Sequence, residues 1–183
     1  MQTAVAEHNN EVCLQEDSLI VSHTDLSGKI SYANRTFMEI SGYREQDLLG
    51  VQHNLIRHPD MPRGVFRLLW DTLKEGREFF GFVKNRCCNG SYYWVFAQVT
   101  VNQDCQGNAI NYCSVRRKAP ASALEVIMPI YREMQRIEDN CASKKQAPDL
   151  SLTYLRDLLQ GKNSCYDRFI IDLYQQVPAR EQS

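Results

Sequence analysis

Residues 53–62 carry a dense group of side chains that can hold a charged ligand. His53, Asn54, Arg57, His58 and Asp60 bring two imidazoles, an amide, a guanidinium and a carboxylate into eight residues. An arginine can bind two oxygens of a pyrophosphate or the edge of an adenine, and free N–H groups at a helix start favour anions. A simpler interpretation is local: Asp60 caps the next helix and pairs with Arg57, while His58 lies at the surface.

A second group lies in the strand-like run 79–86. Alternate residues of a strand share a face, which groups Phe79, Gly81, Val83 and Asn85. Glycine allows another group to approach the backbone closely, and the amide of Asn85 both donates and accepts hydrogen bonds. This face therefore suits the polar edge of a flat ring. The alternative is that Asn85 satisfies neighbouring backbone groups.

The chain that must position these side chains has the composition of a globular protein. It has 183 residues, 43% of them hydrophobic and 23% charged, and a formal net charge of −1. This charge gives no basis for a nucleic-acid surface, and no apolar stretch reaches the ~18 residues that cross a bilayer. The N-terminus lacks the features of a signal peptide. We expect a soluble cytoplasmic protein with no membrane insertion and no nucleic-acid partner.

The seven cysteines predict neither disulfides nor a metal site. Their number is odd, and Cys87 and Cys88 are adjacent rather than spaced as zinc ligands. We expect reduced structural thiols and no bound metal.

The order of elements predicts an α+β fold. Two short strands, 18–22 and 30–33, precede a helix capped by Asn34 and ended by Gly42. After a helical turn at 45–49 and an irregular segment, a helix begins at Pro62, carries Trp70 in the core, and ends at Gly76. Three strands follow, at 78–87, 92–102 and 109–118, the first pair joined by an Asn-Gly turn. We predict a five-stranded antiparallel sheet with short helices over one face.

The rest of the chain is predicted to be helical. An amphipathic helix spans 120–140, where Pro129 should kink or interrupt it. A polar linker at 144–149 precedes short helices at 152–160 and 165–177. The predicted organisation is an N-terminal cap that is flexible or helical (1–17), a sensory domain (18–118), a signalling helix (119–140) and a helical extension (141–183).

Several short motifs resemble the PAS fold, and most closely the flavin-binding PAS domain of bacterial aerotaxis receptors. Ser41-Gly42-Tyr43 and Asn89-Gly90-x-x-Tyr93-Trp94 are typical of PAS domains in general. The run His53-Asn54-Leu55-Ile56-Arg57-His58-Pro59-Asp60-Met61-Pro62 is more specific and carries the cofactor inference. The resemblance covers about residues 18–118.

The resemblance implies that this domain binds FAD and reports its redox state. The implied cofactor-binding residues are His53, Asn54, Arg57, His58, Asp60, Phe79, Asn85, Asn34 and Trp70. Related aerotaxis sensors tend to have tryptophan in place of Phe79, which offers a smaller ring and no indole N–H. For Asn34 the residues themselves favour a helix cap over a pocket contact.

A redox sensor would signal through a protein partner. Reducing a flavin adds electrons and a proton at N5, so this nitrogen changes from a hydrogen-bond acceptor to a donor. A polar residue that faces N5 must then reorient or lose its bond, and the resulting few kcal/mol suffice to shift a two-state equilibrium in the sheet or the flanking helices. The helix 120–140 is the expected output element. Trp94 and Phe96 share a strand face that needs a cover, which the N-terminal segment, the post-sheet helix or a second subunit of a homodimer would supply.

Three other functions fit less well. A haem gas sensor would use His53 or His58 as its axial ligand, and a cofactor-free PAS module would only bind proteins. A light sensor of the LOV type needs a cysteine in the segment 53–62, which has none. No catalytic triad, phosphate-binding loop or paired-carboxylate site is recognisable, so we expect no catalytic residues and no enzyme.

Overall fold

The structure is a computed structural model that describes residues 10–176. It divides into two compact units. Unit 1 comprises Met1–His58 and Val83–Lys118, and unit 2 comprises Pro59–Phe82 and Ala119–Ser183. Within each unit only the residues from 10 to 176 are described below.

The strands form one five-stranded antiparallel sheet in the order β2-β1-β5-β4-β3. This confirms the predicted α+β class and strand number. The strands and their bounds are β1 (Ile20–Thr24), β2 (Ile30–Ala33), β3 (Phe79–Arg86), β4 (Tyr92–Gln103) and β5 (Ala109–Lys118). Strand β3 contributes its first half to unit 2 and its second half to unit 1.

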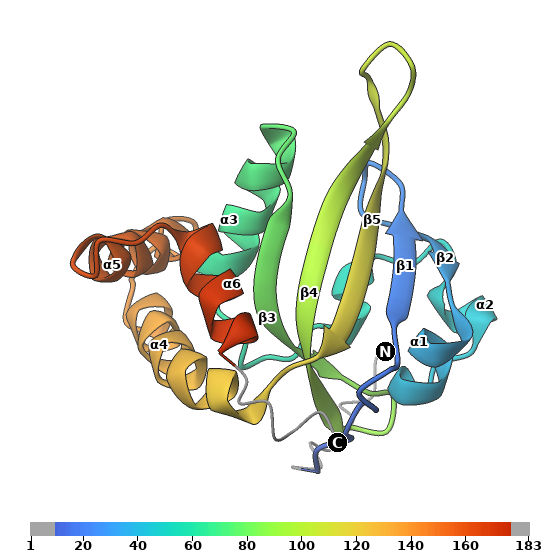
Figure 1. The fold of residues 1–183 in the computed structure, drawn as a ribbon, viewed down its shortest axis with the longest axis horizontal. Coiled ribbons are helices and arrows are strands. Elements are labelled where there is room, and N and C mark those ends of the chain that lie inside the picture. Colours follow the sequence, from blue (N-terminus) through green and yellow to red (C-terminus); the bar gives the residue numbers. More distant parts are fainter. Residues whose placement is uncertain (1–9, 177–183) are drawn as a thin grey trace. The chain divides into compact units, whose positions relative to one another are not determined.

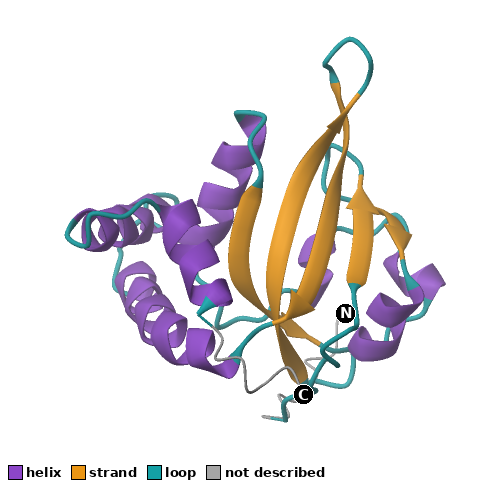
Figure 2. Cartoon of the chain, in the orientation of Figure 1, coloured by secondary structure: helices purple, strands orange, loops and turns teal. Residues whose placement is uncertain are grey.

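Strand register sets the inward face of unit 1. Arg116 of β5 lies opposite Ile20 of β1 on one side and Ala97 of β4 on the other. Because side chains alternate, Ser22 and Tyr93 share that face, and both are buried. The β4–β5 ladder continues past the last β1 partner, Tyr112, so the hairpin extends beyond the edge of its neighbour (Figure 2).

Short helices pack beside β1 and β2 in unit 1 (Figure 1). They are α1 (Arg35–Ser41), α2 (Glu45–Leu48) and the 3₁₀ helix η1 (His53–Ile56). Gly42 ends α1 with φ of 72°, a left-handed conformation that favours glycine. The Asn34 cap is also confirmed: its Oδ1 accepts from the N–H of Phe37 at 3.1 Å.

The N-terminal segment lies against β4 rather than forming a helix. Residues Glu11 and Tyr92 form a parallel bridge, and the N–H of Val12 donates to the carbonyl of Tyr92 at 2.7 Å. Residues 10–17 contain only this bridge and a turn, and the remainder of the predicted cap lies outside the described residues.

Unit 2 is a helical layer with the first half of β3. Its helix α5 contacts both α3 and α4, and α6 contacts α4 and α5 (Figure 1). The helices are α3 (Arg63–Lys74), α4 (Ala121–Asp139), α5 (Ala147–Gln160) and α6 (Tyr166–Gln175).

Of the two effects expected of Pro129, an interruption of the helix is wrong, and a kink stays a prediction. Helix α4 continues through Pro129 without a break, because Pro129 and Glu125, whose carbonyl loses its partner, are both exposed and water can satisfy that carbonyl. The predicted linker 144–149 ends early, since α5 begins at Ala147 with a proline in its first turn, where the missing N–H costs nothing.

The prediction that Trp70 lies in the core is wrong, because 37% of its surface is exposed. Helix α3 buries Val65, Thr72 and Leu73 on one side. At 100° per residue, Trp70 lies well away from the direction that Val65 and Thr72 share.

Candidate functional site

Unit 1 brings three of the predicted ligand-binding residues together. Arg57 and Asn85 form an antiparallel backbone bridge, and the N–H of His58 donates to the carbonyl of Lys84 at 3.3 Å. Asn85 and His58 are buried, while Asn54 is exposed and Arg57 partly so. Arg57 and His58 therefore pair with the second half of β3 at the position of Asn85.

The local interpretation placed His58 at the surface, and this is wrong. Only 5% of its surface is exposed, and its ring lies edge-on to that of Tyr92, with centroids 5.8 Å apart. The ammonium group of Lys84 lies 4.1 Å from the centroid of the same Tyr92 ring.

His53 belongs to a buried polar cluster on the inward face of the sheet. Its Nε2 lies 3.3 Å from the hydroxyl of Ser22, which also accepts from the Nη2 of Arg116. Burial lowers the pKa of His53 to about 3, and the positive charge of Arg116 contributes. The imidazole is therefore neutral at physiological pH.

Asn34 is engaged in holding the backbone. Besides capping α1, its Oδ1 accepts from the N–H of Val21 at 3.0 Å, and its Nδ2 donates to the carbonyl of Leu19 at 2.8 Å. These bonds hold the start of α1 against β1, so the hydrogen bonds of the Asn34 side chain have a structural explanation without a ligand.

Three predicted residues, Asp60, Trp70 and Phe79, belong to unit 2. Asp60 is exposed, and the prediction that it caps α3 is wrong. Pro62 is the N-cap residue and offers no side-chain bond, so the first N–H groups of α3 are satisfied by Glu138 of α4 instead. Phe79 is fully buried and stacks on Tyr166 of α6, with ring centroids 5.7 Å apart and planes at 22°.

Four buried polar atoms in unit 1 have no hydrogen-bond partner among the described residues: Asn85 Nδ2, Tyr93 OH, and Nε and Nη1 of Arg116. Burial raises the pKa of Tyr93, against smaller opposing effects from Arg116 and Asn85. Buried polar groups are nearly always paired in folded proteins, so a cluster of this kind indicates a missing partner.

These atoms fit the polar edge of a flavin ring. Three of the four are N–H donors, and the Tyr93 hydroxyl can donate or accept. The ring presents two carbonyl oxygens and ring nitrogens as acceptors and one N–H as a donor. The unpartnered donors therefore match the acceptors that a flavin ring presents, whereas an apolar ligand would leave them unpaired.

Sequence reasoning missed Ser22, Tyr93 and Arg116 as members of this cluster. Alternation along β4 placed Tyr93 with Val95 and Ala97, which was a usable signal. Arginine is usually exposed, so only the observed pairing of β5 with β1 shows that Arg116 points inward.

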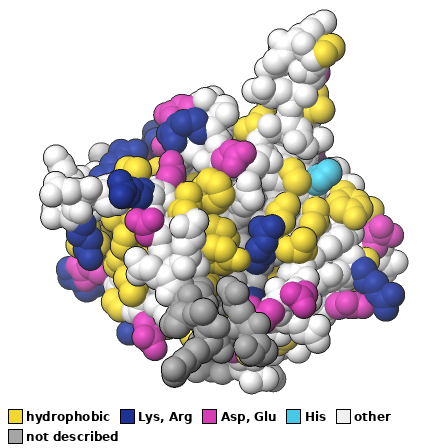
Figure 3. All heavy atoms as spheres, in the orientation of Figure 1, with side chains coloured by type: hydrophobic (Ala, Val, Ile, Leu, Met, Phe, Trp, Pro, Cys, Tyr) yellow, Lys and Arg dark blue, Asp and Glu magenta, His cyan; other side chains and the backbone are white. Residues whose placement is uncertain are grey.

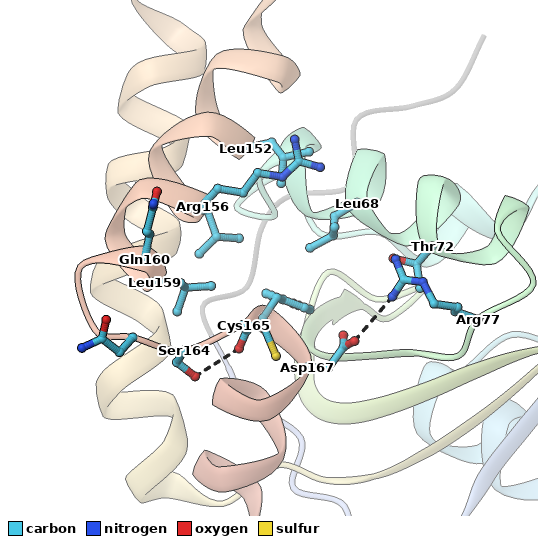
Figure 4. Close-up of a pocket in the computed structure, with 13 residues that line it drawn as sticks. Leu68, Thr72, Arg77, Leu152, Arg156, Leu159, Gln160, Ser164, Cys165 and Asp167 are labelled. Atoms are coloured by element: carbon cyan, nitrogen blue, oxygen red, sulfur yellow. Dashed lines mark hydrogen bonds and ion pairs between the residues drawn. The ribbon is translucent and has the colours of Figure 1, made fainter.

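Unit 2 contains a separate cavity of about 550 Å³. Leu68 and Thr72 of α3, leucines of α5, and residues at the start of α6 line it (Figure 4). Arg77 and Asp167 form an ion pair of 3.5 Å at its rim. The cavity combines apolar walls with the charged side chains of Arg77, Arg156 and Asp167, and it contains none of the predicted ligand-binding residues.

Other site chemistries find little support in residues 10–176. No group of three metal-ligating side chains is present there, and all seven cysteines are free. No helix in this range is both long and apolar enough to span a bilayer. Both acidic and basic side chains are present on the visible surface (Figure 3).

The chain is similar to known sensory proteins. Over 121 residues it is 41% identical to the aerotaxis receptor of Escherichia coli (strain K12), covering 66% of this chain and 24% of the receptor. Over 109 residues it is 28% identical to the nitrogen fixation regulatory protein of Klebsiella pneumoniae, covering 60% of this chain and 22% of that protein. The chain thus spans about a quarter of the length of these relatives.

The fold has solved counterparts as well. The light-state structure of the blue-light photoreceptor Aureochrome1 LOV aligns with a TM-score of 0.54 at 22% identity, covering 64% of this chain and 91% of that one. At this identity the match concerns the fold alone. Residues 30–116 match the family described as PAS fold, and the chain is similar to a part of the aerotaxis receptor.

Proposed function

We propose that this chain is a flavin-binding PAS sensor that reports the redox state of the flavin to a protein partner. The observation that carries the proposal is the set of buried, unpartnered polar atoms on Asn85, Tyr93 and Arg116. The similarity to the aerotaxis receptor supports a sensory rather than an enzymatic role. When bound, the flavin supplies a centre that accepts and returns electrons.

Asn85 is the proposed contact to the ring. Its side chain is buried at 3% exposure, and its Nδ2 has no partner in residues 10–176, so it is ready to donate to a carbonyl oxygen. Its backbone bridge to Arg57 fixes the strand at this point. A buried donor held on a rigid strand fixes the orientation of the ring whose redox state the domain is proposed to report.

FAD is the proposed flavin because it carries a diphosphate and an adenine beyond the ring. The segment 53–60 offers Arg57 as a forked donor and Asn54 and Asp60 as exposed polar groups. The predicted ligand set drawn from this segment, and from Phe79 and Trp70, remains a proposal.

Signal output is proposed to pass from the sensory domain, residues 18–118, to the helix that follows. Strand β5 ends at Lys118 and α4 begins at Ala121, so a shift in β5 reaches α4 through a two-residue connection. The partner is proposed to be a signalling protein, with a homodimer as the working state of a cytoplasmic protein.

The purified chain tests this proposal by its colour and its extracted cofactor. We expect the two absorption bands of oxidised flavin, and FAD on chromatography after denaturation. A sharp haem band, or no colour after reconstitution with FAD, would refute the flavin assignment. The first result would favour the haem sensor and the second the cofactor-free module.

Two substitutions test the contacts. We expect Arg57→Ala and Asn85→Ala to reduce the flavin content at least tenfold. Arg35→Ala and Asn102→Ala are matched controls, because Arg35 is exposed in a pair with Glu39 and Asn102 bonds Asn111 near the hairpin tip. Full flavin content in both test variants would contradict the proposed contacts.

A further inference from the structure

Arg116 is buried without a carboxylate partner. It lies in the middle of the sheet, opposite Ile20 and Ala97, and only 2% of its surface is exposed. No ion pair within residues 10–176 includes it. Charged side chains are almost never fully buried unless they are paired, because desolvation of an isolated charge is costly.

The existing contacts hold the guanidinium in place but do not neutralise it. One nitrogen, Nη2, donates to the hydroxyl of Ser22, and Cζ lies 4.7 Å from the centroid of the Phe37 ring. The other two nitrogens, Nε and Nη1, have no partner among the described residues. The planar donor fork is therefore fixed on one side and open on the other.

The groups that interact electrostatically with Arg116 supply no negative charge. They are His53, which is neutral, and Tyr93 and Cys113, whose hydroxyl and thiol remain protonated because burial raises both pKa values. Burial lowers the pKa of Arg116 itself to about 10, so the guanidinium is still charged at neutral pH. This cluster of side chains thus carries a net positive charge in the interior.

We propose that Arg116 is the cationic partner of the flavin and that it makes the domain bind the reduced flavin more tightly than the oxidised flavin. This inference rests on the proposed flavin-binding function. Two electrons from a reductant and one proton from solvent give a neutral oxidised ring a net charge of −1. The charge of Arg116 then meets an opposite charge in a region of low dielectric, where the attraction is strong.

The same arrangement makes Arg116 unfavourable when no flavin is bound. A buried charge that lacks its counter-charge destabilises the fold, and replacement by a neutral residue of similar volume relieves that cost. A residue that served only to hold β5 against β1 would show the opposite behaviour, because its loss would weaken the flavin-free protein.

The test measures the flavin midpoint potential, flavin affinity and flavin-free stability of the wild-type chain and Arg116→Gln. We expect Arg116→Gln to weaken binding of the reduced flavin at least tenfold more than binding of the oxidised flavin. A tenfold change corresponds to a fall of about 30 mV in a two-electron potential. In the flavin-free protein the same variant should raise the unfolding midpoint.

Two further variants make the result specific. Arg116→Lys keeps the charge but loses the fork, so it should retain most of the potential while binding both forms less tightly. Arg117→Gln removes the same charge from the opposite face of β5 and should change neither property.

The outcomes separate the two proposals. A wild-type chain that takes up no flavin refutes the proposed function and this inference with it. Flavin that binds Arg116→Gln at an unchanged potential refutes the inference alone. A flavin-free Arg116→Gln protein that is less stable than the wild type identifies Arg116 as a structural residue and also overturns the inference.

Discussion

Glu138 joins three helices of unit 2 through one buried carboxylate, and its replacement should loosen that unit. Its Oε1 accepts from the N–H of Gly64 at 2.8 Å and from the hydroxyl of Ser151 at 2.6 Å. Its Oε2 accepts from the N–H of Arg63 at 2.9 Å. The Glu138 side chain is 6% exposed. A residue of α4 thereby caps α3 and binds α5.

The expected magnitude follows from the groups that would be left unsatisfied. Glu138→Ala removes the acceptor of two backbone N–H groups and the ion-pair partner of the Arg63 guanidinium, while the Ser151 hydroxyl keeps the carbonyl of Pro148, and each buried group left unsatisfied costs about 1–3 kcal/mol. We expect a total loss of about 3–5 kcal/mol in the free energy of unfolding, which is a large share of the ~5–15 kcal/mol of a typical domain. Glu138→Gln keeps one acceptor oxygen but turns an amide N–H₂ toward donors, so about half of that loss is expected.

Urea denaturation followed by circular dichroism measures the total effect, and amide hydrogen exchange at Gly64 reports the local one. Glu133→Gln is the matched control, since Glu133 lies on the same helix in a surface pair with Arg136 and its loss should leave the midpoint unchanged. A cost below about 1 kcal/mol for Glu138→Ala, or unchanged protection of the Gly64 amide, would contradict this role of Glu138.

Three further predictions concern single side chains. The pKa of His53 is about 3 in the folded chain, against about 6.5 expected in the unfolded chain. The free energy of unfolding should therefore fall as the pH drops from about 6.5 towards 3, and NMR should find the ring neutral at pH 5. A ring that titrates near pH 6.5 in the folded protein would contradict this. Gly81→Ala should lower the free energy of unfolding by about 1–3 kcal/mol, because the added Cβ would lie 2.8 Å from the ring of Phe79, and an unchanged free energy would show that the ring can move aside. Asn34→Ala should cost about 1–2 kcal/mol, since it removes the α1 cap and the bonds to β1, and Asn34→Asp should recover part of that loss in the same melt; equal stability of all three would disprove the cap.

Local patterns in the sequence predicted the elements of the fold well. The Asn-Gly turn, the cap at Asn34 and the glycine that ends α1 each depend on neighbouring residues only, and all three are present. The strand number and the antiparallel arrangement followed from alternation and short turns, and the resemblance to PAS domains is confirmed by the family match.

Features that depend on distant residues could not be predicted from sequence in this way. The cap of α3 comes from Glu138, which is 74 residues beyond Gly64, while a nearby carboxylate at Asp60 seemed sufficient. The inward direction of Arg116 depends on which strands flank β5. Trp70 looked like a core residue by type, but the direction of the buried side of α3 decides its exposure.

The proline inside α4 gives this helix an uneven stiffness. One backbone rung is missing at Pro129, and beyond it the helix is fastened by Tyr131, whose hydroxyl donates to the carbonyl of Phe82 at 3.0 Å, and by Glu138. The two turns before Pro129 have no such fastening to a buried polar group. Since one backbone hydrogen bond is missing at Pro129, the helix resists bending less at this point than in its second half.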